Sequence, residues 1–312
     1  MNTQKKLSHK GLSKWGRWIP LYLMFLPGAI YLLINNYIPM AGLVIAFKKV
    51  NFNIGIFQSP WVGFDNFKYL FSTNDALLIT RNTLLYNIAF MFLFAFFGVA
   101  FAIFICDVRN KYLKKMYQSI ILFPYLMSTV IIGYIVFAFL SMQNGIVNKS
   151  ILPALGMDPI YWYNEAKHWP FILIFVNLWK GVGYGCLIYI SSINGIDPEL
   201  FEAAGLDGAS KWQQIRHITL PALIPPIITL TLLSIGRIFY SDFGLFYQVP
   251  RNSGMLYSTT NVIDTYVYRG LIAQGNVSMS SAAGFYQSIV GFILVLSANL
   301  IVKKVSSENA LF

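Results

Sequence analysis

The chain has 312 residues, of which 56% are hydrophobic, 17% aromatic and only 11% charged. Soluble domains carry roughly 25% charged residues, so this composition excludes an ordinary soluble domain and indicates a protein solvated by lipid. The net charge is +11, but the cations flank apolar segments instead of forming one face, which argues against a nucleic-acid partner. Cys106 and Cys186 lie inside or at the edge of apolar segments and predict neither a disulfide framework nor a metal site.

Six apolar segments are long enough to cross a bilayer, which takes about 20 residues. In chain order, we place the predicted transmembrane helices at 18–45, 82–106, 117–140, 169–193, 220–240 and 282–302. The first is too long for the apolar core of a signal peptide and lacks a small-residue cleavage site, so we expect it to be retained. The sequence has no internal repeat and therefore predicts one all-α membrane domain.

The positions of Lys and Arg predict the orientation of these spans. With the N-terminus inside, thirteen of the 23 cations fall in about 60 cytoplasmic residues and eight in roughly 105 outside residues, which is a positive-inside bias. We therefore expect a cytoplasmic N-terminal segment at 1–17, a six-span domain at 18–302 and a cytoplasmic tail at 303–312. The long outside loops at 46–81, 141–168 and 241–281 suit either a cap over a cavity or interfacial anchoring by aromatic residues.

The connection between the fourth and fifth predicted spans has strong helix signals. Asp197 can cap a helix that begins at Pro198, where the missing N–H costs nothing. Gly208 should interrupt that helix. Ser210 and Gln213 then offer a capping box for a second short helix that leads into the fifth span.

The same connection carries the most specific motif of the chain. From Glu202 to Pro221 it reads EAAGLDGASKWQQIRHITLP, which has the form EAA-x3-G-x9-I-x-LP. This resembles the EAA loop of ATP-binding-cassette (ABC) importer permeases, the surface that docks on an ATPase. The resemblance implies a type I importer permease fold with a coupling loop at 197–221. The ATPase-coupling residues that it implies are Glu202, Ala203, Ala204, Asp207 and Gly208. The alternative is an ordinary cytoplasmic connection rich in helix formers.

The first span, WIPLYLMFLPGAIYLLINNYIP, looks like the carbohydrate-uptake branch of these importers, which includes the larger maltose-importer permease and permeases for polysaccharide fragments. The resemblance implies a multi-pass subunit of a bacterial plasma membrane, both termini cytoplasmic. The partners that it implies are a second homologous permease, two ATPase subunits, an extracellular solute-binding protein and an oligosaccharide substrate. The chain has no G-x-x-x-x-G-K-[ST] loop, so we expect ATP and Mg to be bound by the ATPase subunits and this chain to be neither an enzyme nor a cofactor protein.

A transport pathway should be lined by polar residues that are costly to place in lipid, about 2.5–3.5 kcal/mol for an Arg or Lys at a helix centre. On the fourth span, Asn177, Lys180, Gly181 and Tyr184 share one helical face. On the fifth, Ser234, Arg237 and Ser241 form a similar row. Asn177, Gly181, Tyr184 and Ser234 resemble sugar-lining positions of the maltose-importer permease. Lys180 and Arg237 stand where that permease has apolar residues.

Two cations at membrane depth favour an acidic, uronate-containing oligosaccharide as the cargo. Lys180 and Arg237 could instead have structural roles, either snorkelling toward the interface or pairing with an acid of the partner permease. In the second case the cargo would be neutral. An ABC permease for another small solute also stays open. An ion-coupled carrier is less favoured because no Asp or Glu lies inside a predicted span, and an embedded enzyme because no carboxylates converge.

Overall fold

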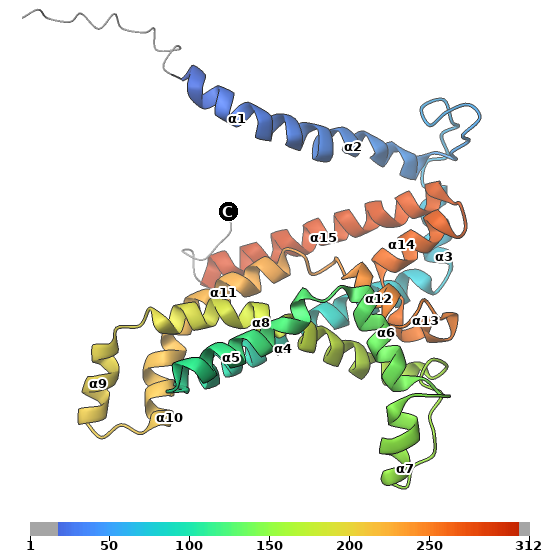
Figure 1. The fold of residues 1–312 in the computed structure, drawn as a ribbon. Helices are drawn as coiled ribbons and strands as arrows, with labels where there is room; N and C mark the ends of the chain where they lie inside the picture. The colour runs from blue at the N-terminus through green and yellow to red at the C-terminus, as the bar shows by residue number, and fades with distance from the viewer. Residues whose placement is uncertain (1–17, 306–312) are drawn as a thin grey trace, which may run out of the picture.

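The computed structural model describes residues 18–305. The predicted N-terminal segment 1–17 and residues 306–312 of the predicted tail lie outside the described residues. Within 18–305 the chain is helical, with no strand and one isolated bridge between Lys48 and Trp61. The predicted all-α class is therefore confirmed (Figure 1).

Five helical segments among the described residues are long and apolar enough to cross a membrane. They are Ile19–Phe47, Asp75–Asp107, Ala166–Asn194, Lys211–Ile235 and Val277–Leu300. A sixth span exists when the bent pair Lys111–Leu126 and Thr129–Leu140 is counted as one. Counted in this way, the described residues contain up to six spans, in line with the six expected ones, and two of them differ in shape from the prediction.

The third predicted span, 117–140, is not one straight helix. Helix α5 (Lys111–Leu122) continues into a short 3-10 turn and is followed by α6 (Thr129–Leu140) at an angle of 96°. Pro124 lacks a backbone N–H and restricts the residue before it, so the α-helix ends there. Ser128 starts the next helix, because its hydroxyl accepts the Ile131 N–H at 3.3 Å.

The fifth predicted span, 220–240, ends earlier than expected. Helix α11 (Leu220–Ile235) stops before Gly236, and residues up to Asp242 form turns and an irregular segment. Side chains from elsewhere bind the freed backbone here: Asp264 accepts the Ser241 N–H at 2.7 Å, and Gln287 donates to the Phe239 carbonyl at 2.9 Å. The predicted helical row of Ser234, Arg237 and Ser241 is therefore wrong.

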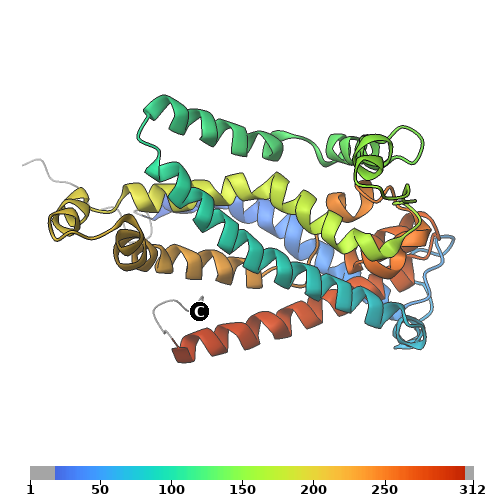
Figure 2. The same cartoon turned by 90° about the horizontal axis from the view of Figure 1, so that it is seen from below.

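The centre of the bundle is the crossing of α4 (Asp75–Asp107) and α8 (Trp169–Asn194), which Figure 2 shows most clearly. Gly183 lets α8 approach α5 very closely, since a Cβ atom there would lie 2.1 Å from the Ile121 carbonyl oxygen. On the other side, α15 (Val277–Val305) packs against α14 (Ile263–Ile272) and α3 (Asp65–Ser72).

The first span stands apart from this bundle. It consists of α1 (Ile19–Leu32), a π-turn, α2 (Ile38–Met40) and a 3-10 segment that ends at Phe47. None of the residues of α1 or α2 is buried, and Figure 1 shows the whole segment separated from the other helices along most of its length.

Short helices mark the two ends of the bundle (Figure 1). At one end, which we call the α9 end, α9 (Pro198–Leu206) and α10 (Lys211–Gln214) project from the spans. At the opposite end, the α7 end, lie α7 (Leu152–Ala154), α12 (Phe243–Gln248) and α13 (Tyr257–Thr260). The long loops predicted to lie outside are thus at the opposite end from the EAA segment.

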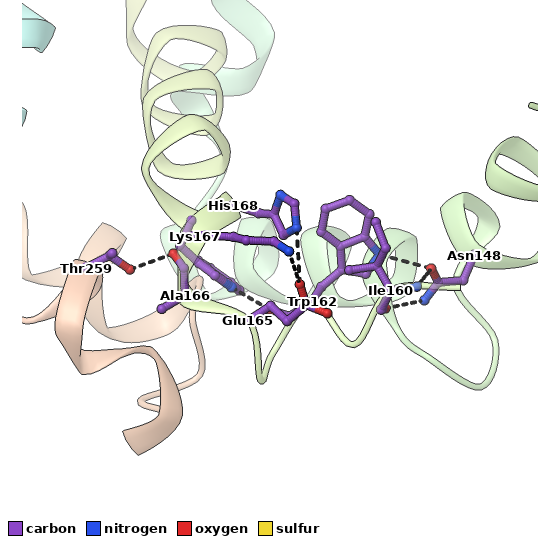
Figure 3. Close-up of polar contacts among 9 residues, drawn as sticks. Asn148, Ile160, Trp162, Glu165, Ala166, Lys167, His168 and Thr259 are labelled. Carbon is purple, nitrogen blue, oxygen red and sulfur yellow. Dashed lines mark hydrogen bonds and ion pairs between the residues drawn. The ribbon is translucent and has the colours of Figure 1, made fainter. Parts of the chain in front are cut away.

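A hydrogen-bonded network at the α7 end fixes the start of α8 (Figure 3). The Asn148 Oδ1 atom accepts the indole N–H of Trp162 at 3.1 Å. The indole N–H of Trp169, the first residue of α8, donates to the Trp162 carbonyl at 2.6 Å. The Thr259 hydroxyl donates to the Ala166 carbonyl at 2.9 Å, which ties this loop to α13. The network satisfies polar groups that packing would otherwise leave unpaired.

Candidate functional site

A cavity of about 760 Å³ lies between α4, α8, α11 and the start of α12. It brings together most of the predicted pathway residues. Those on its wall are Asn177, Gly181, Tyr184, Ser234 and Arg237, and Ser241 lies there as well although it is outside the helix. We call this space the central cavity. Whether a cargo touches these side chains stays a prediction.

Helix α8 presents one face to the central cavity. Asn177, Gly181 and Tyr184 follow one another at helical spacing on that face. The Tyr184 ring is exposed and stacks on Tyr125, with ring centroids 4.8 Å apart and planes 11° from parallel. Gly181 leaves room for Phe94, because a Cβ atom at Gly181 would lie 2.8 Å from that ring. The face therefore offers an amide and, about two helical turns further along, the flat surface of an aromatic ring.

Lys180 does not lie on the wall of the central cavity. Its ammonium group donates a hydrogen bond to the Thr129 hydroxyl at the start of α6. Thr129 itself packs against Gly244, which does line the cavity. Lys180 is therefore held beside the cavity, at the junction of α6, α8 and α12.

Arg237 reaches the cavity from the turn that follows α11. The turn is held by hydrogen bonds from the Arg237 N–H to the Ser234 carbonyl and from the Tyr240 N–H to the Arg237 carbonyl, at 3.0 and 2.9 Å. The Arg237 side chain is exposed, and no carboxylate among residues 18–305 forms an ion pair with it. A guanidinium in this position can bind an anionic group with two parallel hydrogen bonds.

Two carboxylates moderate this positive charge. Asp242 lines the same cavity and caps α12, since its Oδ1 atom accepts the Leu245 N–H at 3.1 Å. Asp264 is partly buried behind the turn, where burial raises the pKa of its carboxyl group. Its hydrogen bonds and the charge of Arg237 act in the opposite direction.

The sequence analysis missed several residues of the cavity wall, including Asn87, Tyr189, Tyr240 and Asp242. Asn87 donates to the Tyr240 carbonyl at 3.1 Å, so it also joins α4 to the turn after α11. The available signal was a lone amide in the apolar run of α4, which is costly in lipid unless it has a partner or faces a cavity. Tyr189 and Tyr240 carry no such signal.

The predicted coupling loop has the local structure that its sequence indicates. Asp197 caps α9 by accepting the Glu199 N–H at 3.0 Å, with Pro198 as the first helical residue. The helix ends at Leu206, and Gly208 follows with φ of +78°, a conformation that favours glycine. Ser210 and Gln213 form the expected capping box for α10. These elements are confirmed.

The surface of the coupling loop is free in the described chain. Glu202, Ala203, Asp207 and Gly208 are exposed, Ala204 is half-buried, and the Leu206 side chain at the end of α9 is 91% exposed. An ion pair of 3.0 Å between Lys211 and Asp107 fixes α10 to the end of α4. An exposed leucine on a small-residue helix suits a protein partner, but contact with an ATPase stays a prediction.

Comparison with known proteins gives three consistent similarities. Residues 95–307 match the family model described as "Binding-protein-dependent transport system inner membrane component". The chain is 35% identical to protein LplB of Bacillus subtilis (98% of this chain, 94% of LplB). It is 36% identical to YteP, the polygalacturonan/rhamnogalacturonan transport system permease protein of the same organism (93% and 89%).

A solved structure extends the likeness to three dimensions. The chain superposes with a TM-score of 0.82 and 33% identity on a chain of the bacterial alginate ABC transporter in complex with an alginate pentasaccharide-bound periplasmic protein. The superposition covers 93% of this chain and 96% of that one.

Proposed function

Because this chain belongs to the family of binding-protein-dependent transport system inner membrane components, we propose that it is the permease subunit of an ATP-driven importer for acidic oligosaccharides. It is a multi-pass membrane protein and a transport subunit, not an enzyme. In the proposal, the central cavity forms half of the translocation pathway and a second, homologous permease supplies the other half.

The observation that carries the acidic cargo is the exposed guanidinium of Arg237, which forms no ion pair within residues 18–305, on the wall of a cavity that also offers an amide, hydroxyls and flat rings. A uronate residue can bind all of these groups, because it has one carboxylate, several hydroxyls and an apolar ring face. Two similar proteins support the same class: YteP is named for polygalacturonan and rhamnogalacturonan, and the similar solved transporter for alginate. Lys180, bonded to Thr129 beside the wall, adds positive potential rather than direct contact.

A neutral oligosaccharide is the competing cargo, and Asp242 is the observation that favours it. Its carboxylate lines the same cavity as Arg237 and reduces the attraction for an anion. In that alternative Arg237 would bond sugar hydroxyls or a carboxylate of the second permease.

The rest of the proposed assembly follows from the family. Two ATPase subunits would bind ATP and Mg and dock on α9 through Glu202, Ala203, Ala204, Asp207 and Gly208. The α9 end and both termini would be cytoplasmic. A binding protein would deliver cargo at the α7 end, in line with the periplasmic protein bound to the similar alginate transporter. Closure of the ATPases would bias the permeases between outward and inward access.

The test is uptake by the full importer in proteoliposomes. The two cargoes are a galacturonate trimer and the same trimer with its carboxyl groups reduced to alcohols. We expect uptake of the charged trimer, and we expect Arg237→Gln to lower it at least tenfold because a charge-assisted bidentate contact is lost. Arg237→Lys should retain part of it.

The matched control is Lys68→Gln, which removes an exposed cation that, among the described residues, forms an ion pair with Asp65 on α3 and with no other acid. This variant should transport normally. Equal uptake of the two trimers by the unaltered importer would reject the acidic cargo and favour the neutral one. Full activity of Arg237→Gln would remove the central cavity from the proposal.

A further inference from the structure

A second, smaller cavity lies at the α7 end of the bundle, between α6 and the end of α12. Its volume is about 360 Å³, and its wall includes Tyr134, Tyr247, Gln248, Arg251 and Asn252. We call it the outer pocket. We propose that the outer pocket binds one carboxylate-bearing sugar residue and is the station at which an acidic oligosaccharide enters the permease. This inference rests on the proposed function, since it assumes an acidic cargo.

The outer pocket collects hydrogen-bond donors that have no acceptor among residues 18–305. Neither the Arg251 guanidinium nor the Gln248 side-chain amide forms a hydrogen bond within that range. Asn252 uses its amide oxygen, which accepts from Arg269 at 2.9 Å and from the Tyr257 hydroxyl at 3.1 Å. Those contacts fix the orientation of the Asn252 amide and leave its NH₂ group available. Three side chains therefore present donors in one place, which suits a ligand rich in oxygen atoms.

The charge of the outer pocket also favours an anion. Arg251 is its cation, and its wall contains no carboxylate, in contrast to the central cavity with Asp242. The Arg251 guanidinium lies 4.1 Å from the centroid of Phe137 and 5.9 Å from that of Tyr134. Stacking on rings holds the guanidinium plane in place without using its N–H groups, which stay free for a carboxylate.

The backbone of the outer pocket is held in an unusual conformation. Arg251 and Asn252 have φ of +54° and +49°, a region that residues with side chains seldom occupy. Hydrogen bonds from their N–H groups to the carbonyls of Gln248 and Tyr247 maintain it, at 3.2 and 3.0 Å. Strained residues persist where their surroundings hold them, and they gather at binding sites. Here the strain points two neighbouring polar side chains into one pocket.

The floor of the outer pocket is rigid because α6 and α12 are in close contact. A Cβ atom at Gly133 of α6 would lie 2.8 Å from the carbonyl oxygen of Gln248. No side chain separates the two backbones at this point, so neither helix can shift without opening the contact.

Helix α12 connects the outer pocket to the central cavity. Phe243 and Gly244 line the central cavity, whereas Tyr247 and Gln248, one turn later, line the outer pocket. The rings of Phe243 and Tyr247 stack with centroids 5.0 Å apart and form one continuous aromatic surface. Arg251 at the outer pocket and Arg237 in the central cavity then give an acidic chain two successive cations to bind, and Lys180 adds positive potential from behind the wall between them.

The experiment measures binding directly, on the assembled permeases and ATPases in nanodiscs without the binding protein. Saturation-transfer NMR reports the dissociation constants of the galacturonate trimer and of its carboxyl-reduced form. We expect Arg251→Gln to weaken binding of the charged trimer about tenfold and to leave the reduced trimer unchanged, as for loss of one charge-assisted contact. Arg251→Lys should restore part of the affinity, and gel filtration checks that each variant assembles.

The control is Lys149→Gln at the same end of the bundle, where the exposed Lys149 ammonium group donates a hydrogen bond to the Asn144 side-chain oxygen at 3.3 Å and to no other residue of 18–305. If Lys149→Gln weakens binding of the charged trimer as much as Arg251→Gln does, the effect is unspecific electrostatic attraction, and the proposed role of the outer pocket is overturned. The outer pocket would also be overturned if the unaltered complex prefers the charged trimer and Arg251→Gln binds that trimer with full affinity. That result would leave the proposed function unaffected. If the unaltered complex binds the charged trimer no better than the reduced one, both proposals fail.

Discussion

The first and fourth spans are equally apolar, yet the fourth packs into the bundle along its length, whereas the first packs against it only at its 3-10 end, Ala41–Phe47. Their most apolar stretches have the same mean hydropathy, but 6% of the residues are buried in the first and 28% in the fourth. Helix α8 lies between α4 and α5, whereas no residue of α1 is buried. Hydropathy therefore indicates that a helix tolerates lipid, and it does not indicate which helices pack against it.

Two pairs of matching residues, one member from each span, show this difference in packing. Gly183 of α8 is in backbone contact with α5, while a Cβ atom at Gly28 of α1 would meet nothing within 4 Å. Trp169 at the start of α8 is fully buried and hydrogen-bonded, while Trp18 before α1 is 54% exposed. The same substitution in each pair should therefore have very different consequences.

Gly183→Ala should have the largest effect. The new methyl group would overlap the Ile121 carbonyl, and only backbone movement could relieve the overlap. We expect a loss of about 3 kcal/mol in the free energy of unfolding, the upper part of the usual range for overpacking. Denaturant titration of the purified chain measures it, with Gly28→Ala as the matched control. Equal stabilities of the two variants would contradict the contrast between the spans.

Trp169→Phe should come next. The substitution removes the indole N–H and leaves the partly buried Trp162 carbonyl without its partner. Loss of a hydrogen bond at such a place costs about 1.5 kcal/mol. The corresponding change Trp18→Phe should lie within about 0.5 kcal/mol of zero, as is usual at exposed positions. The contrast is lost if the titration gives similar values for both.

Removal of the N-terminal cap of α9, the helix that follows α8, should have a smaller effect on stability. Asp197→Ala removes the side chain that accepts the Glu199 N–H, which should destabilise α9 by about 1 kcal/mol. Helix α1 begins at Ile19, and Trp18 before it provides no side-chain cap, so Trp18→Ala should not change the fraying of α1. Hydrogen exchange of the first amides of each helix measures both. Unchanged protection of α9 in Asp197→Ala would show that the loop does not depend on its cap.

The smallest effect concerns an exposed charge cluster just before α8. The hydrogen bond from Lys167 holds the pKa of Glu165 below its ordinary value of 4.5. The folded state thus favours the ionised form, so the stabilisation is present above about pH 4.5 and disappears as the pH falls through the lowered pKa. Glu165→Gln should lower the unfolding temperature slightly at neutral pH and not at all at the acidic end of the titration. A difference that grows toward acidic pH would have the wrong sign.

The sequence predicted best what depends on neighbouring residues. The caps by Asp197 and Ser210 and the break at Gly208 follow from local chemistry, and the structure has them. The bend at Pro124 and the early end at Gly236 were missed, because a long apolar window hides short breaks. Both places contain a residue that disfavours a continuing α-helix, Pro124 in one and Gly236 in the other, whatever the hydropathy of the segment around it.

Long-range features were predicted only in part. Residues on one face of α8 were predicted to act together, and the structure places Asn177, Gly181 and Tyr184 on one cavity wall. The helical spacing that grouped Lys180 with them did not place it there, because Thr129 of α6 binds its ammonium group. The outer pocket forms where α6 packs against α12, and no local sequence pattern predicts that these two helices are in contact.

The helical run from Lys211 to Ile235 joins the coupling loop to the central cavity. It is not one straight rod, because a π-helical segment at Ile215–Thr219 separates α10 from α11, and Figure 1 shows the two helices running in different directions. Lys211 forms an exposed ion pair with Asp107 of α4 at one end, and Ser234 lies on the cavity wall at the other. Within α11, Pro225 and Pro226 remove two successive backbone N–H donors, so this helix bends more easily there than elsewhere. A displacement of α10 would therefore reach the cavity wall only to the extent that the π-helical segment and the proline pair are stiff enough to transmit it.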